Sequence, residues 1–306
     1  MIKDRNIADD AAIQPHKLLA PGAGEIFYVG TSGTAPYNYY RAKVKGSQLF
    51  TSIDTAIGNC VADRGDIIYV LPKHTETIGA AGGITADIAG VSIIGLGNGN
   101  SRPTLTWSAT ASSFLITAAN VLVKNIITTI SIDEVVSMFA VSAAGVTLDA
   151  VDFVPYASGQ AIQWLLTTNA ADQLTIKNCF HRQTAAANTA QKWIQLVGTD
   201  HTRILNNTIW MTAKADTASH AISGSTAVVQ CEIVGNRIAF LGATITIIIN
   251  LVTTSTGIIS DNRLAGGAAV LLAVGITGDA CYMWENYLTN TVAASGAIAP
   301  QADTVT

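Results

Sequence analysis

The sequence contains few charged residues: Asp, Glu, Lys and Arg together make up only 12% of its 306 residues. Its 17 basic and 21 acidic residues give a net charge of −4, and the basic residues form no cluster. Because a basic patch is the electrostatic signature of nucleic-acid binding, that function is not expected. The apolar runs are too short to span a membrane, and none follows Met1–Arg5, so we expect neither a membrane partner nor a secretory signal.

Cysteine is also scarce. The four cysteines, Cys60, Cys179, Cys231 and Cys281, have neither the spacing of a metal site nor that of a disulfide framework. We therefore expect free thiols in a protein that is made in a reducing cytoplasm. The chain also lacks a phosphate-binding glycine loop, a Ser-His-Asp order and a metal-ligand motif. These absences predict no metal, no cofactor and no catalytic residue.

Two groups of residues are nevertheless candidates for catalysis or for binding. One group lies near expected turns and comprises His181, Arg182, Asp200, His201, Asp216 and His220. Such a set supports general acid–base catalysis if neighbouring turns bring it together, but histidines in turns are more often solvated or locally hydrogen-bonded. The other group is Trp164, Trp193 and Trp210. Exposed tryptophans would stack on sugars and buried ones would fill the interior or an interface, and the sequence leaves both open.

What the sequence does contain is a motif that returns at successive intervals of 30, 25, 28, 29, 29, 26 and 24 residues, counted from Gly95. One position of the motif, here called the Asn slot, is filled by Asn125, Asn178, Asn207, Asn236, Asn262 and Asn286. Gly95 and Ala150 occupy the slot in two further copies. A period in this range marks a solenoid, in which each copy stacks on the next.

Within each copy, apolar residues lie two positions before and two positions after the Asn slot, which is strand periodicity. If these apolar residues point into a core, the slot residue points inward as well. A single buried Asn is costly, but Asn amides that stack between parallel strands hydrogen-bond to one another. We therefore predict that the six slot asparagines form a structural ladder and not a binding site. The same alternation predicts that Cys179 points outward.

The position before the Asn slot is expected to face solvent. In chain order it holds Lys124, Asp149, Lys177, Asn206, Gly235, Asp261 and Glu285. The alternating signs of the first three predict a ladder of ion pairs between strands. Arg237 and Arg263 follow the slot and, with Asp261 nearby, indicate a mixed-charge surface and not an acidic groove. No pair of carboxylates with the separation that a glycosidase needs is recognisable.

The repeat over residues 50–290 resembles the right-handed parallel β-helix, the pectate-lyase-like solenoid. Ile53, Ala56 and Ile57 at helical spacing predict a short capping helix that begins near Ser52, and Gly65–Pro72 predicts the first long strand. A cap is required because the end of a solenoid exposes backbone and core. About eight turns, about 4.8 Å apart, would make an all-β rod roughly 40 Å long.

The expected organisation is an N-terminal arm at 1–24, a first strand and the capping helix at 25–64, the β-helix at 65–290 and a C-terminal tail at 291–306. Within the second segment, Phe27–Val29 is expected to form a strand. The following residues, with Tyr37, Tyr39 and Tyr40, are expected to form a loop.

The segment Asp4–Ile13 with His16–Leu18 resembles the N-terminal segment of many bacteriophage fibre and head-surface proteins, which docks the protein on the virion. The resemblance implies a docking role for Ile7, Ala11, Ile13, Lys17 and Leu18. Low charge, and stretches such as Ile245–Val252 and Gly267–Val274 that are apolar on both strand faces, favour lateral faces buried between subunits. We expect a closed homo-oligomer, a homotrimer by analogy with the family.

These resemblances favour a non-enzymatic virion structural protein of a tailed bacteriophage, in particular a capsid-surface decoration protein. Its partners would be the major capsid protein or other virion proteins. It would be made in the host bacterial cytoplasm and located on the virion surface. The alternative is a tailspike or tail-fibre component that binds or depolymerises host surface polysaccharide. A stand-alone polysaccharide lyase is the weakest hypothesis, because the chain lacks a signal sequence and a Ca²⁺-type stack of carboxylates.

Overall fold

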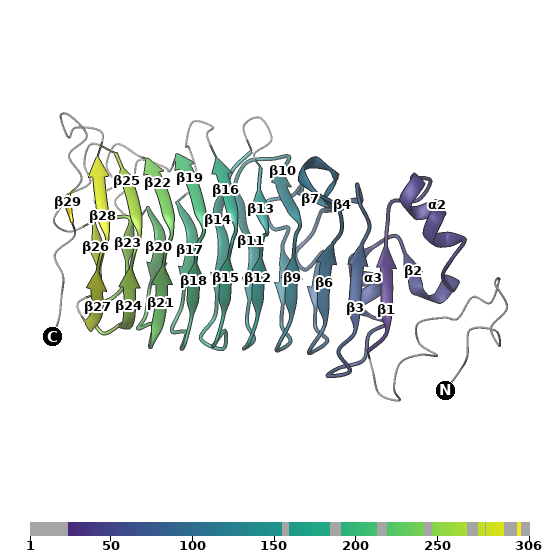
Figure 1. Ribbon diagram of the computed structural model, residues 1–306, viewed down its shortest axis with the longest axis horizontal. Coiled ribbons are helices and arrows are strands. Elements are labelled where there is room, and N and C mark those ends of the chain that lie inside the picture. Colours follow the sequence, from purple (N-terminus) through teal and green to yellow (C-terminus); the bar gives the residue numbers. More distant parts are fainter. Residues whose placement is uncertain are drawn as a thin grey trace, which may run out of the picture.

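The computed structural model describes residues 24–154, 159–183, 191–212, 219–241, 247–267, 275–278, 280–290 and 299–300. These residues form a parallel β-helix, in agreement with the prediction from the repeat. The strands stack side by side from the N-terminal helices to β28, so the molecule is a rod whose long axis runs across the strands (Figure 1). Among the described residues, no helix is long and apolar enough to cross a membrane.

The rod has three sheets, here named A, B and C, and between residues 67 and 290 the chain contributes one strand to each in turn. Sheet A contains β1 (Ile26–Val29), β2 (Leu49–Phe50), β3 (Ile67–Val70), β6 (Ser92–Gly95), β9 (Leu122–Lys124), β12 (Thr147–Asp149), β15 (Thr175–Lys177), β18 (Arg203–Leu205), β21 (Cys231–Val234), β24 (Thr256–Ser260) and β27 (Ala280–Trp284). Sheet C contains β5 (Ile84–Ala86), β8 (Phe114–Ile116), β11 (Val135–Val141), β14 (Ala161–Thr167), β17 (Lys192–Leu196), β20 (His220–Gly224), β23 (Ile249–Asn250) and β26 (Ile276–Thr277).

Sheet B lies between them along the chain and carries the candidate site. It contains β4 (Thr75–Ile78), β7 (Thr104–Trp107), β10 (Ile127–Ile130), β13 (Asp152–Phe153), β16 (Phe180–Gln183), β19 (Thr208–Thr212), β22 (Arg237–Leu241), β25 (Arg263–Gly266), β28 (Tyr287–Asn290) and β29 (Ala299–Pro300). Its strands pair in parallel, except that β29 pairs antiparallel with β28. Equivalent residues of successive turns therefore stand in straight rows along the rod.

In most strands of sheets A and B every second side chain fills the interior, as strand periodicity requires. In sheet C, β20 is buried at every position. In the middle of the rod the filling is aromatic. Trp164 stacks on Trp193 with ring centroids 5.7 Å apart and meets Phe139 at 5.3 Å. Both tryptophans are at most 1% exposed, whereas Trp210 is 54% exposed. The two alternatives left open for the tryptophans therefore both occur: Trp164 and Trp193 fill the core, and Trp210 lies on the surface.

The N-terminal end is covered by α3 (Ile53–Ile57), which lies where a capping helix is predicted and buries Ile53, Ala56 and Ile57. Ser52 is the N-cap residue, but its side chain makes no capping hydrogen bond. The carboxylate of Glu76 on β4 accepts from the backbone N–H of Ile53 at 3.0 Å instead. A negative charge at this position is favourable because of the helix dipole. Two short 3₁₀ helices are also present, Gly46–Gln48 and Gly99–Ser101.

The loop predicted around the tyrosines is wrong, since Tyr37, Tyr39 and Tyr40 belong to α2 (Ala35–Arg41). Thr34 starts this helix by accepting a hydrogen bond from the backbone N–H of Tyr37, and a proline follows within the first turn. Tyr40 packs on Tyr28 of β1 with ring centroids 4.5 Å apart. Helix α2 is thus attached to the end of sheet A.

Candidate functional site

The predicted Asn slot divides into two neighbouring rows of the solenoid. Sheet A pairs Lys124 with Asp149, Asp149 with Lys177 and Lys177 with Leu205. This register aligns Asn125 and Asn178 with Asn206, the residue before Asn207. The resulting row comprises Asn125, Ala150, Asn178, Asn206, Gly235, Asp261 and Glu285, all with φ between 52° and 71°. It is a row of left-handed corners, for which Asn and Gly are suited, so the placement of Asn125 and Asn178 in an internal ladder is wrong.

The internal ladder has four members, one residue further along: Asn207, Asn236, Asn262 and Asn286, each at most 1% exposed. The side-chain amide nitrogens of the first three donate to the amide oxygen of the next at 2.9, 3.0 and 2.9 Å. Each of those oxygens also accepts the backbone N–H of the previous member. Every amide thus has partners on neighbouring turns, and its role is structural.

Cys179 belongs to this inner row, so its predicted outward orientation is also wrong. The side chain is 2% exposed, and its backbone N–H donates to the amide oxygen of Asn207 at 2.9 Å. Burial raises the pKa of the Cys179 thiol to about 12. All four cysteines are free and buried. Since the thiolate is the reactive form, Cys179 is expected to be unreactive.

The predicted charge ladder on sheet A has its first three members in register. Asp149 forms ion pairs with Lys124 at 3.0 Å and with Lys177 at 3.9 Å. It also accepts from the side-chain amide of Asn178 at 2.9 Å. Beyond Lys177 the row continues through residues 205, 234, 260 and 284, and the predicted continuation through residues 206 to 285 belongs to the corner row.

Replacing Asp149 by Asn is expected to lower the free energy of unfolding by about 1 kcal/mol at pH 7, because the lysines are partly exposed. Burial raises the pKa of Asp149, but the hydrogen bond from Asn178 and the two lysines outweigh it, so the pKa lies below its usual value. The stabilisation is therefore complete above the unfolded pKa of about 3.9 and is lost as the pH falls through the folded pKa. Denaturant titrations at pH 7 and pH 3 should show the variant and the wild type converging at the lower pH.

The histidines and acids considered for acid–base catalysis do not come together. His181 is on β16 of sheet B, Asp200 and His201 precede β18 of sheet A, and His220 is on β20 of sheet C. His220 is buried; its Nδ1–H donates to the carbonyl of Ile247 at 3.0 Å, and its Nε2 accepts from the Asn250 amide at 2.9 Å. Asp216 lies outside the described residues. Among the residues that are described, no three His, Cys, Asp or Glu side chains form a group that could hold a metal ion.

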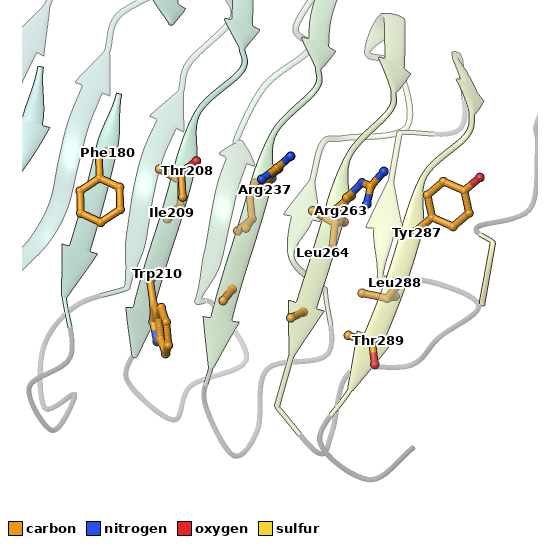
Figure 2. Close-up of a pocket in the computed structure, with 13 residues that line it drawn as sticks. Phe180, Thr208, Ile209, Trp210, Arg237, Arg263, Leu264, Tyr287, Leu288 and Thr289 are labelled. Carbon is orange, nitrogen blue, oxygen red and sulfur yellow. The ribbon is translucent and has the colours of Figure 1, made fainter. Parts of the chain in front are cut away.

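The outer face of sheet B is hollowed by a groove with a volume of about 480 Å³, here called the sheet B groove. It crosses β16, β19, β22, β25 and β28 and is lined by Phe180, Thr208, Ile209, Trp210, Arg237, Ile238, Ala239, Arg263, Leu264, Ala265, Tyr287, Leu288 and Thr289. Figure 2 shows Phe180 and Tyr287 at opposite ends, with Arg237 and Arg263 on the strands between them.

Strand register explains the shape of the groove. One outward row runs through Phe180, Thr208, Arg237, Arg263 and Tyr287, and the next runs through Trp210, Ala239, Ala265 and Thr289. The two alanines between the larger Trp210 and Thr289 leave the hollow. Phe180, Trp210 and Tyr287 are 41%, 54% and 41% exposed, and both arginines are exposed as well.

The sequence prediction placed Arg237 and Arg263 on one outer surface but missed the groove. The alternation Ile209, Trp210, Met211 was an available signal, because an aromatic residue between two apolar ones on a strand points outward when they point inward. The alanine floor and Tyr287 could be added only with the register of neighbouring turns.

Comparisons of the chain with protein-family models, with curated proteins and with solved structures find no match. The fold and the sheet B groove are therefore the observations from which function can be argued. The residues expected to dock the chain on a virion, Ile7, Ala11, Ile13, Lys17 and Leu18, lie outside the described residues, so docking through them stays a prediction.

Proposed function

We propose that the sheet B groove binds an extended polysaccharide without cleaving it, and that the chain is a polysaccharide-binding component of a bacteriophage tailspike or tail fibre. The observation that carries the proposal is the exposure of Phe180, Trp210 and Tyr287 around one concave surface. Exposed aromatic residues gathered in a hollow mark binding sites, since water contact with them is unfavourable. Aromatic faces stack on the C–H faces of sugar rings, and arginines donate hydrogen bonds to their oxygens.

The course of the groove suits a linear polymer. It runs along the rod, across strands that are about 4.8 Å apart, so the three steps from β19 to β28 span roughly 14 Å. This path is straight because the rows of the solenoid are straight. The described residues of its lining include no Asp or Glu, whereas glycoside hydrolysis normally uses two carboxylates that flank the bond. This part of the lining therefore supports binding and offers no pair of carboxylates for hydrolysis.

A capsid-surface decoration protein is the competing proposal, and it rests on the resemblance of the N-terminal segment. Decoration requires contact with the shell at one end of the rod and gives no reason for an aromatic groove along its side, so the groove supports the tailspike or fibre proposal. The copy number in purified virions, measured by quantitative mass spectrometry, distinguishes the two. A handful of copies per particle is expected, and a number comparable to the coat protein would favour decoration.

Replacing Trp210 by Ala is expected to weaken polysaccharide binding at least about tenfold, which corresponds to about 1.4 kcal/mol or more. The side chain is largely exposed, so stability should change by less than about 0.5 kcal/mol. Binding is measured by calorimetry or affinity electrophoresis with purified bacterial capsular and O-antigen polysaccharides.

Trp284→Ala is the matched control, because Trp284 is also exposed, at 38%, but lies on β27 of sheet A outside the groove. This variant is expected to bind like the wild type. An equal loss of polysaccharide affinity in both variants, or no loss in Trp210→Ala, would show that the sheet B groove is not the polysaccharide-binding site.

A further inference from the structure

We propose that Arg237 and Arg263 form a carboxylate-binding subsite in the sheet B groove, so that the polysaccharide it takes is an acidic one with uronate-type carboxylates. The inference rests on the proposed function, because it names the chemical class of the polymer. It is carried by a different observation, which is the electrostatic environment of the two arginines.

Arg237 and Arg263 are register partners on the adjacent parallel strands β22 and β25. Their backbones are therefore about 4.8 Å apart, and both side chains leave the same face of the sheet. Like charges directly opposite each other on neighbouring strands destabilise a sheet. An anion bound between the guanidinium groups would convert this repulsion into attraction.

Three other cations on the outer faces of the rod have anionic partners. Arg203 pairs with Glu232 at 2.9 Å on sheet A, and Arg102, which precedes β7, pairs at 2.6 Å with Asp152 on β13 of sheet B. Lys124 pairs with Asp149. Such pairing is expected in a solenoid, because opposite charges on neighbouring strands stabilise the sheet.

Arg237 and Arg263 differ from these cations, since within the described part of the chain neither forms an ion pair. Asp261, the acid nearest to Arg263 in sequence, and Glu285, at the same position one turn further on, are exposed corner residues with φ of 55° and 52°. The buried Asn262 separates Asp261 from Arg263 along the chain. The two positive charges therefore remain available to a ligand in the groove.

The surroundings of the pair favour a carboxylate on a sugar ring. Thr208 and Tyr287 flank the arginines in the same outward row, while Ala239 and Ala265 leave space beside them. The planar guanidinium group matches a carboxylate through two parallel hydrogen bonds. A sugar could thus place its acidic group on the arginines and a ring face on Tyr287, which Figure 2 shows beside Arg263.

The test compares the full-length protein with the double variant Arg237→Gln/Arg263→Gln on a panel of acidic and neutral bacterial surface polysaccharides. Each acidic polysaccharide is also used after chemical reduction of its carboxylates to alcohols. The wild type should bind the acidic form at least about tenfold more tightly than the reduced form, and increasingly so at low salt. The double variant should lose this preference. Arg203→Gln, which removes a positive charge from sheet A, is the matched control and should keep it.

Equal affinity of the wild type for the native and the carboxyl-reduced polymers would overturn the carboxylate subsite. So would a preference for polymers whose only acidic groups are phosphodiesters. If neutral polysaccharides bind and Trp210→Ala abolishes that binding, the proposed function stands without the subsite. If no polysaccharide of the panel binds, both fail. Light scattering completes the test, since a change of oligomeric state in the double variant alone would assign the arginines to an interface between copies of the chain.

Discussion

Replacing Asn236 by Ala is expected to lower the free energy of unfolding of the β-helix by about 4 kcal/mol. The Asn236 amide oxygen accepts from the backbone N–H and the side-chain amide of Asn207 at 3.0 and 2.9 Å. Its amide nitrogen donates to the Asn262 side chain at 3.0 Å and to the Ile204 carbonyl at 2.8 Å. All four hydrogen bonds are buried. Truncation of the side chain therefore leaves buried donors and acceptors without partners, each at a cost of about 1–3 kcal/mol.

Denaturant unfolding, followed by circular dichroism, measures the effect as a shift of the midpoint. Asn206→Ala is the control, because Asn206 is the exposed neighbour of the ladder in the left-handed corner row, with φ of 56°. It should lose only about 1 kcal/mol, the backbone preference of Asn for that conformation. If Asn236→Ala were no more destabilising than Asn206→Ala, the buried ladder would contribute nothing beyond the corner geometry.

The fold could be predicted from the sequence because its determinants are local. The apolar alternation inside each copy specifies strands, and the return of the motif specifies stacking. The register between copies is less well specified. In the copy Leu205, Asn206, Asn207 the adjacent asparagines allow two alignments. The repeat pattern aligns Asn207 with Asn178, whereas the register of sheet A aligns Asn206 with Asn178. A slip of one residue reverses the side of every side chain, which is why Cys179 was placed outside.

The groove could not be predicted because it depends on distances across turns and not along the chain. Trp193 and Trp210 are 17 residues apart in the sequence, yet one is buried in sheet C and the other exposed on sheet B. Which parity points inward changes wherever a turn adds or removes a residue. The groove arises from the small side chains of Ala239 and Ala265, and no sequence motif predicts that two alanines lie in register.

His181 gives the second large expected effect, a loss of stability in mild acid. Its imidazole is 2% exposed inside the rod, where it stacks on Phe153 with ring centroids 4.5 Å apart and meets the edge of Trp164 at 6.3 Å. Burial lowers the pKa of His181 to about 3. The unfolded chain binds a proton at this residue near pH 6.5. Between these values the unfolded state therefore holds more protons than the folded state.

Because the unfolded state holds more protons, the free energy of unfolding falls as the pH falls through this range. The contribution of His181 to stability is constant above about pH 6.5 and falls by up to about 1.4 kcal/mol per pH unit as the pH drops toward 3. Burial also lowers the pKa of His220, which adds a loss of the same sign. The contribution of His181 is therefore measured as the difference between the wild type and His181→Phe, whose ring preserves the packing on Phe153.

At pH 7, His181→Phe should match the wild type within about 1 kcal/mol, as volume-conserving substitutions in a core usually do. At pH 4 the variant should be the more stable protein by about 3 kcal/mol, because it has no proton to exclude. Denaturant midpoints at half-unit steps from pH 7 to pH 4 measure the difference. His181→Leu packs differently but also lacks the imidazole. The pH dependence of the free energy of unfolding should therefore decrease by the same amount in both variants. Parallel curves for the wild type and both variants would show that the imidazole can be protonated inside the folded rod.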